Sequence, residues 1–431
     1  MDLKPTKPLS GFIELLPVQQ RCFDECARRM QNVLQNCGYS RLDLPAIERA
    51  EVLTDKDNWD EIETQIFLFQ KGDTKMGLRY DGTVGLSRYV AGHLNELTFP
   101  FYTYQFARNY RGERPQRGRY REFWQMDIDI LGVQNLSLNY DAEIVSTLMR
   151  VYESVADIVG AVRVKIGNRR FWNAMFAYLN LNEAQSREAF VLIDKRDKMN
   201  DFLDGMIEAV GADAAREIDS VFTNGYRSFA GKTAELDGAI SEMDTFMNLL
   251  NAMGVKNAEI DVSIMRGHSY YTGIVFEFFS IDYPDLPAVG GGGRYENLVS
   301  KFSKTKIVGV GASIGVSRLL VALMESGKID LSKFESSVDA IILVMGDNNL
   351  EYAMRVLNEL RGAGVASLAY LDTDKKFKNQ IEYADKIMAK YSVIIGEDEA
   401  KNNVVAVKDM ATGDQRTLSV FDAIKLVRGN V

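Results

Sequence analysis

Arginine is concentrated in one short stretch of this chain, between residues 106 and 132. The stretch holds Arg108, Arg111, Arg114, Arg117, Arg119 and Arg121. A guanidinium group binds phosphate oxygens through two parallel hydrogen bonds, so clustered arginines are typical of a polyphosphate site. The whole chain has a formal net charge of −9, and any nucleic acid must therefore be met by local basic patches. On the cluster alone, a solvated loop with surface salt bridges is an equally good interpretation.

The residues beside the arginines favour a binding site. Two predicted strands, FPFYTYQFARNY and GRYREFWQMDIDIL, are joined by the polar loop GERPQR. Alternation along the strands would send Arg111 and either Arg119 or Arg121 to one face of the sheet. The strands also carry rings on which a base could stack and acceptors for a cationic group. The rings are Tyr104, Phe106, Phe123 and Trp124, and the acceptors are Asp127 and Asp129.

Length and composition predict a multidomain protein of the cytoplasm. The chain has 431 residues, 46% of them hydrophobic, which is enough for two or three cores. Its start, MDLKPTKPLS, has no apolar core of the signal-peptide type, and no membrane segment is expected. The three cysteines, Cys22, Cys26 and Cys37, lie in one helical pattern and are interpreted as reduced packing residues, with no structural metal expected.

The elements around the arginines predict an antiparallel sheet. A long helix should open at Pro17 and close at Gly38. A strand is expected over Leu42 to Ile47, and QIFLFQKGDTKMGLRYDGT is typical of a hairpin. Strand pairs joined by hairpins imply antiparallel pairing.

The second half of the chain divides into three parts. Helical spacing from Arg169 to Asn251 predicts an all-helical insertion, after which strand patterns return. A polar stretch from Gly327 to Ser337 is the best linker candidate. Beyond it strands alternate with helices, which predicts a small α/β domain with a mostly parallel sheet.

Several segments together resemble the class II aminoacyl-tRNA synthetases, in their histidyl form. RNYRGERPQRGRYREFWQMDIDILG resembles motif 2 of that class, GVGASIGVSRL resembles motif 3, and LRYDGTVGLSRY resembles the segment that binds the amino acid. MRGHSYYTGIVFE and GGGGRYENLV resemble the histidine signature and the glycine-rich segment after it. The tail KNQIEYADKIMAKYSVIIGEDEAKNNVVAVKDMATGDQR is similar to the family's anticodon-binding domain.

The resemblance covers essentially the whole chain, in the family's order, and implies its architecture. The fold class is α/β, with an α+β catalytic domain built on the class II antiparallel sheet at 1–326. A helical insertion interrupts that domain at about 170–252. A C-terminal α/β anticodon-binding domain follows at 337–431.

The resemblance also implies a reaction and an ATP site. The carboxylate of histidine attacks the α-phosphorus of ATP, pyrophosphate leaves, and histidine is then transferred to tRNA(His). Such a histidine–tRNA ligase needs positioning and positive charge more than a nucleophilic side chain. By resemblance, Arg111 binds the α-phosphate and the substrate carboxylate, and Arg266 stabilises charge on the opposite side. The other ATP-binding residues would be Glu113, Arg119, Phe123 and Arg318, and Mg²⁺ would accompany ATP, held largely by phosphates and waters.

A histidine site follows from the same resemblance. The α-ammonium group would be held by Asp81, helped by Thr83 and Gln125. The imidazole has two ring nitrogens, and reading both requires an acceptor and a donor in fixed places. The family places these groups at Asp129 and Tyr271, with Tyr270 beside them.

Contacts with tRNA and with a second copy of the chain are expected as well. The loop residues Arg114, Gln116 and Arg117 could reach the acceptor end of the tRNA. Lys376 and Lys378, in or near one predicted helix of the last domain, would add phosphate contacts. By resemblance, the helix from Pro17 and the strand at Leu42 to Ile47 would build a two-fold dimer interface. The expected partners are therefore tRNA(His), histidine, ATP and a second subunit, with no membrane.

Some positions depart from the family pattern. His268 and Ser269 stand where Leu and Asp are usual, Ser317 replaces a Glu, and Gly290 and Gly291 lie where Cys-Ala is frequent. All motif arginines are in place, so these changes bear on histidine affinity more than on ATP chemistry.

Two other interpretations remain open. One is a non-enzymatic paralogue, such as the synthetase-like regulatory subunit that binds an ATP phosphoribosyltransferase. That class typically lacks the C-terminal domain and has lost motif arginines. The other is a synthetase-like enzyme that attaches an amino acid to a non-tRNA acceptor.

Overall fold

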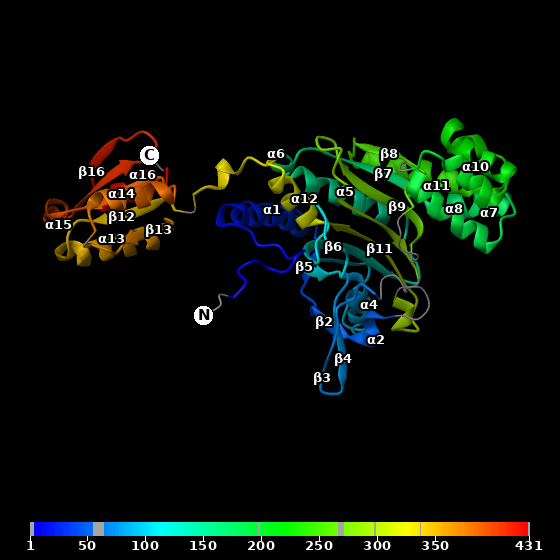
Figure 1. Cartoon of the computed structure of the whole chain (residues 1–431), viewed down its shortest axis with the longest axis horizontal. Coiled ribbons are helices and arrows are strands. Elements are labelled where there is room, and N and C mark those ends of the chain that lie inside the picture. The colour runs from blue at the N-terminus through cyan, green and yellow to red at the C-terminus, as the bar shows by residue number, and fades with distance from the viewer. Residues whose placement is uncertain are drawn as a thin grey trace. The chain divides into compact units, whose positions relative to one another are not determined.

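The computed structural model describes residues 4–54, 64–196, 199–265, 271–296, 299–336, 338–373 and 375–429. Contacts divide the chain into two compact units (Figure 1). The first contains Met1–Glu14 and Phe23–Ile329, and the second contains Leu15–Cys22 and Asp330–Val431.

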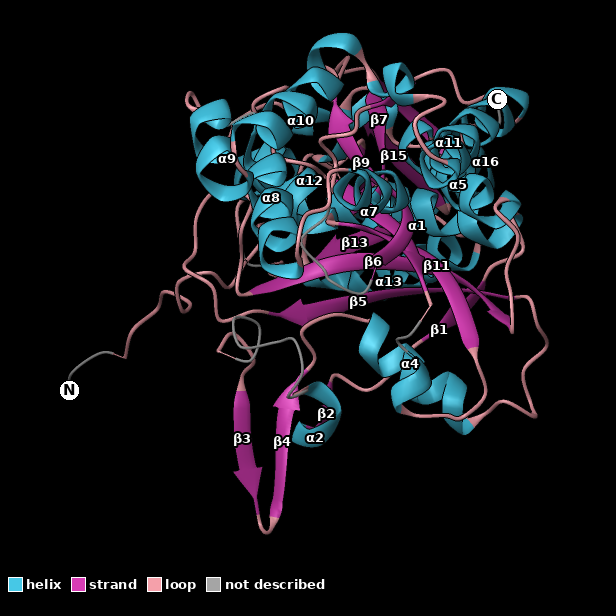
Figure 2. Ribbon diagram, turned by 90° about the vertical axis from the view of Figure 1, so that its right-hand side faces the viewer, coloured by secondary structure: helices cyan, strands magenta, loops and turns pink. Residues whose placement is uncertain are grey.

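The first unit is built on an eight-stranded sheet in the order β1-β5-β6-β11-β10-β9-β7-β8. Figure 2 shows the long strands β5 and β6 of this sheet side by side. Of the pairings between the strands of the sheet, β1–β5 and β7–β8 are parallel and the others are antiparallel. The prediction of an antiparallel sheet is therefore confirmed. The strands are β1 (Ser40–Leu42), β5 (Phe101–Tyr110), β6 (Glu122–Val133), β7 (Val162–Asn168), β8 (Ala258–Ile260), β9 (Tyr271–Ser280), β10 (Gly290–Tyr295) and β11 (Ile307–Ile314).

Strand β6 separates the core of this unit from its pocket. Its side chains alternate between the two faces of the sheet, as in any strand. Met126, Ile128 and Ile130 are fully buried. The helices α5 (Asn139–Glu153) and α12 (Val316–Glu325) pack against β6, and α5 also packs against β11. The odd-numbered residues of β6 are thus left for the opposite face.

The residues that follow β1 in the chain form a small three-stranded sheet, in the order β2-β4-β3. It consists of β2 (Ile47–Arg49), β3 (Leu68–Lys71) and β4 (Thr74–Leu78), and β3 and β4 form the predicted hairpin. The expected strand over 42–47 is wrong, because β1 ends at Leu42 and β2 begins at Ile47 in a different sheet. Pro45 lies between them and has no N–H to donate to a ladder.

Helices make up most of the rest of the first unit. The expected long helix is α1 (Pro17–Asn36), followed by Gly38 at a φ of 83°. The predicted helical run from Arg169 to Asn251 is confirmed, and Trp172 within it donates its ring N–H to the carbonyl of Val262 at 2.7 Å. The helices of the run are α7 (Arg169–Tyr178), α8 (Glu183–Lys195), α9 (Phe202–Val210), α10 (Ala212–Asn224) and α11 (Ala234–Ala252), and the shorter ones elsewhere are α2 (Ala50–Leu53), α4 (Thr83–Gly92) and α6 (Ala156–Val159).

The second unit has a five-stranded sheet in the order β13-β12-β14-β15-β16. The expectation of a mostly parallel sheet is only half right. β12 runs parallel to β13 and β14, but β15 pairs antiparallel with β14 and β16. The connections explain this, because β14 reaches β15 through a single short helix and β15 reaches β16 through a turn, whereas a parallel pairing needs a long crossover. The strands are β12 (Ala340–Val344), β13 (Ser367–Tyr370), β14 (Tyr391–Ile395), β15 (Val404–Asp409) and β16 (Gln415–Ser419), and the helices are α13 (Leu350–Gly362), α14 (Phe377–Lys386), α15 (Glu397–Asn402) and α16 (Val420–Val427).

None of the helices in the described ranges combines the length and apolarity that a membrane crossing requires.

Candidate active site

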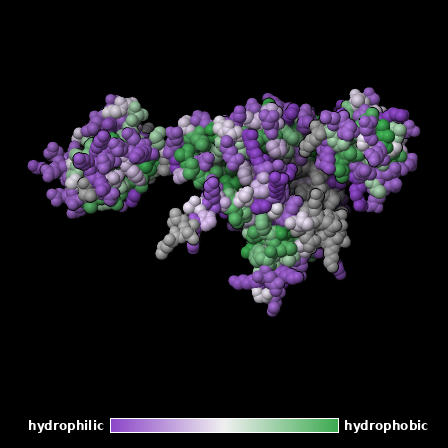
Figure 3. Space-filling view, viewed as in Figure 1, coloured by the Kyte–Doolittle hydropathy of each residue, from purple (hydrophilic) through white to green (hydrophobic). Residues whose placement is uncertain are grey.

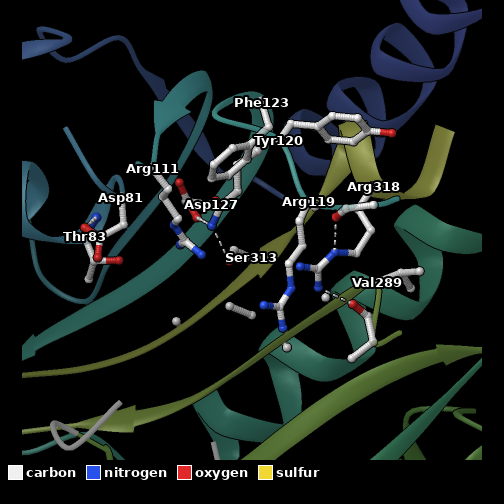
Figure 4. A pocket seen from close by; sticks show the side chains of 18 of the residues that line it. Asp81, Thr83, Arg111, Arg119, Tyr120, Phe123, Asp127, Val289, Ser313 and Arg318 are labelled. Carbon is white, nitrogen blue, oxygen red and sulfur yellow. Dashed lines mark hydrogen bonds between the residues drawn. The ribbon is translucent and has the colours of Figure 1, made fainter. Parts of the chain in front are cut away.

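A pocket lies on the face of the large sheet that carries the odd-numbered side chains of β6 (Figure 4). Its empty volume is ≈ 1030 Å³ including the solvent at its mouth, which is room for two small molecules side by side. All the described residues assigned from the resemblance to ATP or histidine line it: Arg111, Glu113, Arg119, Phe123 and Arg318, and Asp81, Thr83, Gln125, Asp129 and Tyr271.

Arg111 lies directly after β5 and is held between two rings. Its guanidinium carbon is 4.3 Å from the centroid of the Tyr80 ring and 5.1 Å from that of Phe123. Its Nε donates to the carbonyl of Tyr80 at 3.4 Å. Contact with two aromatic faces fixes the plane of the cation. A preorganised positive charge therefore projects into the pocket.

Two further arginines extend the basic end of the pocket. Arg318, at the start of α12, donates from Nε to the carbonyl of Gly118 at 2.9 Å and from Nη1 to that of Ala288 at 2.8 Å. Arg119 faces Glu113 at 3.6 Å, and its side chain is 54% exposed. This end is open to water and suits a ligand with several phosphate oxygens.

Three buried aspartates form the other end of the pocket. Asp81 accepts hydrogen bonds at one oxygen from the N–H groups of Thr83 and Val84, 3.0 and 3.1 Å away, at the first turn of α4. Burial raises the pKa of Asp81. Burial, and then the neighbouring Asp81 carboxylate, raise the pKa of Asp127 to about 7. Burial raises the pKa of Asp129 to about 8, against the opposing hydrogen bond from Tyr295. Ionising these buried carboxyl groups costs free energy, and a cationic ligand would stabilise their ionised form.

Hydrogen bonds hold the polar side chains of this end in place. Gln125 donates from Nε2 to Asp127 Oδ1 at 2.8 Å and to Ser313 Oγ at 2.6 Å. Asn109 donates to Gln125 Oε1 at 3.1 Å, and Tyr295 donates its hydroxyl to Asp129 Oδ1 at 2.8 Å. The acidic end is thus prearranged by β5, β6, β10 and β11.

Several pocket residues received no role from the sequence, among them Tyr120, Tyr295 and Ser313. Asp127, which was predicted only as an acceptor for a cationic group, also lines the pocket. The period of two from Gln125 through Asp127 to Asp129 places these three residues on one face, in agreement with the prediction of Asp127 and Asp129 as acceptors. Tyr295 stands in the glycine-rich segment, but nothing local marks Ser313.

The structure corrects part of the interpretation of the aromatic residues. Phe123 lines the pocket, but Tyr104 is fully buried elsewhere in the sheet. Phe106 and Trp124 stack on each other at 4.7 Å, and Trp124 also contacts the ring of Phe23 in α1 at 6.3 Å. The prediction that these three rings could receive a base is therefore wrong, because the pleat directs them away from the pocket.

The second arginine facing the pocket is Arg119. The alternative, Arg121, is not among the pocket-lining residues, and its Nε donates instead to the carbonyl of Glu113 at 3.1 Å. Both candidates lie in the connection between β5 and β6, and Arg119 is the one that lines the pocket.

The positions that depart from the family pattern are partly accounted for. Ser317 is buried, and its hydroxyl accepts the N–H of Trp124 at 2.9 Å, which ties α12 to β6. Gly290 and Gly291 line the pocket. The predicted catalytic Arg266 and the histidine-binding Tyr270 lie outside the described residues, as do His268 and Ser269.

The residues suggested for tRNA do not line the pocket. Arg114 and Gln116 are exposed in the loop between β5 and β6, and Arg117 donates to Ser326 Oγ. In the second unit, Lys376 precedes α14 and is exposed, and Lys378 lies 3.8 Å from Glu382. Within the described ranges, no three His, Cys, Asp or Glu side chains are grouped so as to hold a metal ion.

An antiparallel sheet with an arginine-lined pocket, preceding a separate small α/β unit, has the architecture of a class II aminoacyl-tRNA synthetase. A family model described as histidyl-tRNA synthetase matches residues 11–319, and one described as anticodon binding domain matches residues 339–430. The chain belongs to the histidyl-tRNA synthetase family.

Individual relatives agree with this. A protein named histidine–tRNA ligase from Clostridium tetani is 36% identical, with 99% of each chain covered. The crystal structure of histidyl-tRNA synthetase from Nostoc sp. PCC 7120 superposes with a TM-score of 0.87 at 28% identity over 100% of each chain. A structure described as an ATP phosphoribosyltransferase regulatory subunit/histidyl-tRNA synthetase, from Bacillus halodurans C, has a TM-score of 0.71 at 19% identity, covers 86% of this chain and 96% of its own, and shares the fold.

The predicted family, fold class and enzyme class are thereby confirmed. The family is that of aminoacyl-tRNA synthetases that activate histidine with ATP and transfer it to tRNA(His), which is the predicted function.

Proposed function

We propose that the pocket is where histidyl-adenylate forms, with ATP at its arginine end and histidine at its aspartate end. The observation that carries the proposal is the separation of charge along one pocket. In Figure 4, Asp81 lies at one side, Arg111 and Asp127 follow, and Arg119 and Arg318 lie at the other side. An anionic and a cationic substrate group would each meet the opposite charge.

Arg111 is proposed to serve the reacting atoms. The carboxylate oxygen of histidine forms a bond to the α-phosphorus while the bond to the pyrophosphate oxygen breaks. Negative charge then gathers on the oxygens of the α-phosphate, and a preorganised guanidinium stabilises it without reorganisation. Arg266 would act on the opposite side of this phosphate, a role that rests on its place in the histidine signature.

The ATP site would use the remaining basic and aromatic groups. Phe123 and Arg318 would flank the adenine, with Arg318 also reaching the γ-phosphate. Arg119 and Glu113 would complete the site. ATP would enter as its Mg²⁺ complex, with the ion held by phosphates and waters.

The histidine site would use the buried polar groups. Asp81, Thr83 and Gln125 would hold the α-ammonium group, and Asp129 and Tyr271 would read the imidazole, with Tyr270 beside them. The hydrogen bond from Tyr295 fixes the carboxylate of Asp129, which supports its use for a ring of defined orientation. A site of this kind rejects analogues by leaving its own buried groups unpaired.

Transfer to tRNA would involve both parts of the chain. We assign the catalytic domain to 1–326, with its helical insertion at about 170–252, and the anticodon-binding domain to 337–431. Arg114, Gln116 and Arg117 would approach the acceptor end. Lys376 and Lys378 would contact phosphates of the tRNA.

The working form is proposed to be a homodimer in the cytoplasm. Ile47, Leu68 and Phe69 on the small sheet are 48%, 49% and 41% exposed. Figure 3 shows apolar side chains gathered at β2 and the base of the β3–β4 hairpin. Contiguous exposed apolar surface is typical of a protein–protein interface, which supports dimerisation through this sheet together with α1.

The test is ATP–pyrophosphate exchange by the purified protein with each of the twenty amino acids, without tRNA. Exchange that depends on histidine alone is expected, and charging of tRNA(His) transcripts should follow. Histidine-dependent exchange without charging of tRNA would favour a non-tRNA acceptor. A folded protein that binds histidine or ATP but gives no exchange would instead indicate a regulatory paralogue.

A further inference from the structure

One oxygen of Asp127 is buried and has no hydrogen-bond partner in the part of the chain that the structure describes. The side chain of Asp127 is 4% exposed, and its Oδ1 accepts from Gln125 at 2.8 Å. Among the residues that the structure describes, its Oδ2 has no hydrogen-bond partner, although the residue lines the pocket. Buried carboxylate oxygens nearly always have a partner, so this oxygen points to a ligand that supplies a donor.

The unpartnered oxygen lies against the turn that carries Asp81. A Cβ on Gly82 would come within 2.6 Å of Asp127 Oδ2, so any larger residue there would displace the Asp127 carboxylate. Gln105 Nε2 donates to the carbonyl of Gly82 at 3.1 Å and holds the turn in this place. The structure therefore brings two buried carboxylates together at one end of the pocket.

Two cations among the described residues act on these carboxylates, and both have other partners. Arg79 donates to the carbonyls of Leu44 and Arg108, at 2.9 and 2.7 Å. Arg111 is held by the rings of Tyr80 and Phe123. Both contribute only at longer range to the two carboxylates, which leaves a positive charge to be supplied by substrate.

We propose that Asp127 is a second acceptor for the α-ammonium group of histidine, which it shares with Asp81, while Asp129 serves the imidazole. This inference rests on the proposed function of the pocket. An ammonium group has three N–H donors, and the two carboxylates would accept two of them. Gln125, bonded to the other oxygen of Asp127, would orient that carboxylate.

Strand geometry supports this division of labour between Asp127 and Asp129. Residues two apart on a strand share a face but stand about 7 Å apart along it. Asp127 pairs across β6 and β11 with Ser313, and Asp129 with Gly311. A Cβ on Gly311 would lie 2.0 Å from Asp129 Oδ1, so the glycine leaves room for the Asp129 carboxylate beside its own partner strand.

The titration of Asp127 is consistent with such a role. Burial and the Asp81 carboxylate raise its pKa to about 7, against the opposing effects of the hydrogen bond from Gln125, the Arg79 guanidinium and the Ser313 hydroxyl. The buried Asp129 carboxylate faces the same end of the pocket, and Arg111 acts on Asp81. An arriving ammonium group favours the ionised carboxylate, so histidine binding should release protons near pH 7.

The experiment compares histidine with β-imidazolelactic acid, which carries a hydroxyl group in place of the α-ammonium. Asp127→Asn keeps the shape of the side chain and removes its charge. At pH 8, the variant should raise the KM for histidine in pyrophosphate exchange about 10- to 100-fold, as expected for a hydrogen bond to a charged group. The inhibition constant of β-imidazolelactic acid should change less than about threefold, because the lost charge has no ammonium to face.

The control is Asp129→Asn, which should weaken both compounds. An unchanged KM for histidine in Asp127→Asn, or equal weakening of both compounds, overturns the role of Asp127 while leaving the function of the pocket intact. Absence of histidine-dependent exchange in the unaltered protein would overturn both.

A second measurement needs no variant. Calorimetry of the unaltered protein at pH 7, in two buffers of different ionisation enthalpy, should show protons released on binding histidine and fewer on binding β-imidazolelactic acid. Equal release with the two compounds contradicts the proposal even if Asp127→Asn does not fold.

Discussion

The two ends of the pocket differ in how far their charged side chains are exposed to water. At the arginine end the side chains of Arg111 and Arg119 are 22% and 54% exposed. At the aspartate end Asp81, Asp127 and Asp129 are 7%, 4% and 3% exposed. The arginine end is exposed to water, so dissolved ions can screen its charges. The aspartate end is buried, and hydrogen bonds hold its side chains in place.

This difference matches the two kinds of ligand. A polyphosphate brings many oxygens, counterions and water, so its site gains from several arginines that need not each be buried. An amino acid offers few polar groups, and a site must surround each of them to tell one amino acid from another. Single changes at the arginine end should therefore alter rate most where they touch the reacting phosphate, and changes at the aspartate end should alter selectivity.

The largest effect is expected from Arg111→Ala. Removing one preorganised donor to developing charge typically lowers kcat by about 10²- to 10³-fold. Pyrophosphate exchange at saturating ATP and histidine would measure this. Arg108→Ala is the matched control, because the Arg108 guanidinium lies 5.0 Å from the Trp124 ring and does not line the pocket. A loss below tenfold in Arg111→Ala would show that the arginine end does not stabilise the reacting phosphate through this residue.

The next largest effect is expected from Asp129→Asn. It should lower kcat/KM for histidine about 10- to 100-fold, because a hydrogen bond to a charged group is lost. The KM for ATP should stay within about threefold, since the change lies at the other end of the pocket. The KM for histidine and the KM for ATP should be measured on the same preparation of the variant and compared with those of the unaltered protein. An equal rise in both KM values would mean that the two ends are not separate.

The aspartate end should also show in the pH dependence of stability. The pKa values of Asp127 and Asp129 are raised to about 7 and 8, so the folded state binds protons that the unfolded state has lost. The stabilisation from these protons is full below about pH 4 and disappears as pH rises through about 7 to 8. Urea unfolding of Asp129→Asn without substrate should therefore lose less stability between pH 5 and pH 8 than the unaltered protein, by about 1–3 kcal/mol. An identical pH profile would contradict the raised pKa of Asp129.

Local pattern was enough to predict much of this arrangement. The period of two in β5 and β6 predicted two long paired strands, and the order of motifs predicted the family. Arg111, Phe123 and Asp129 lie in segments whose residues the structure brings into one pocket. Helical spacing located the run from α7 to α11, because its apolar residues pack on a helical face.

What failed depends on contacts between distant segments. The period of two already places Trp124 on the face opposite Phe123, but that this face is covered by Phe23 of α1 is set by a distant contact. Tyr295 reaches Asp129 only because β10 and β6 both flank β11, and no local signal encodes that strand order. The antiparallel β15 and β16 follow from the short connections after β14 and β15.

The smallest expected effect lies away from both ends of the pocket. The double change Lys376→Ala with Lys378→Ala removes two exposed charges at the start of α14. If they contact tRNA phosphates, the KM for tRNA(His) should rise about two- to fivefold, and the slope of log KM against log salt should fall by up to about two. Pyrophosphate exchange without tRNA should not change. Lys401→Ala, at an exposed lysine of α15, is the control, and an unchanged salt slope in the double variant would contradict a contact between these lysines and tRNA.

High salt also distinguishes these exposed lysines from the buried aspartate end of the pocket, because exposed charges are screened at high ionic strength and buried ones are not. The defect of the lysine variant should therefore disappear in high salt, whereas that of Asp129→Asn should persist.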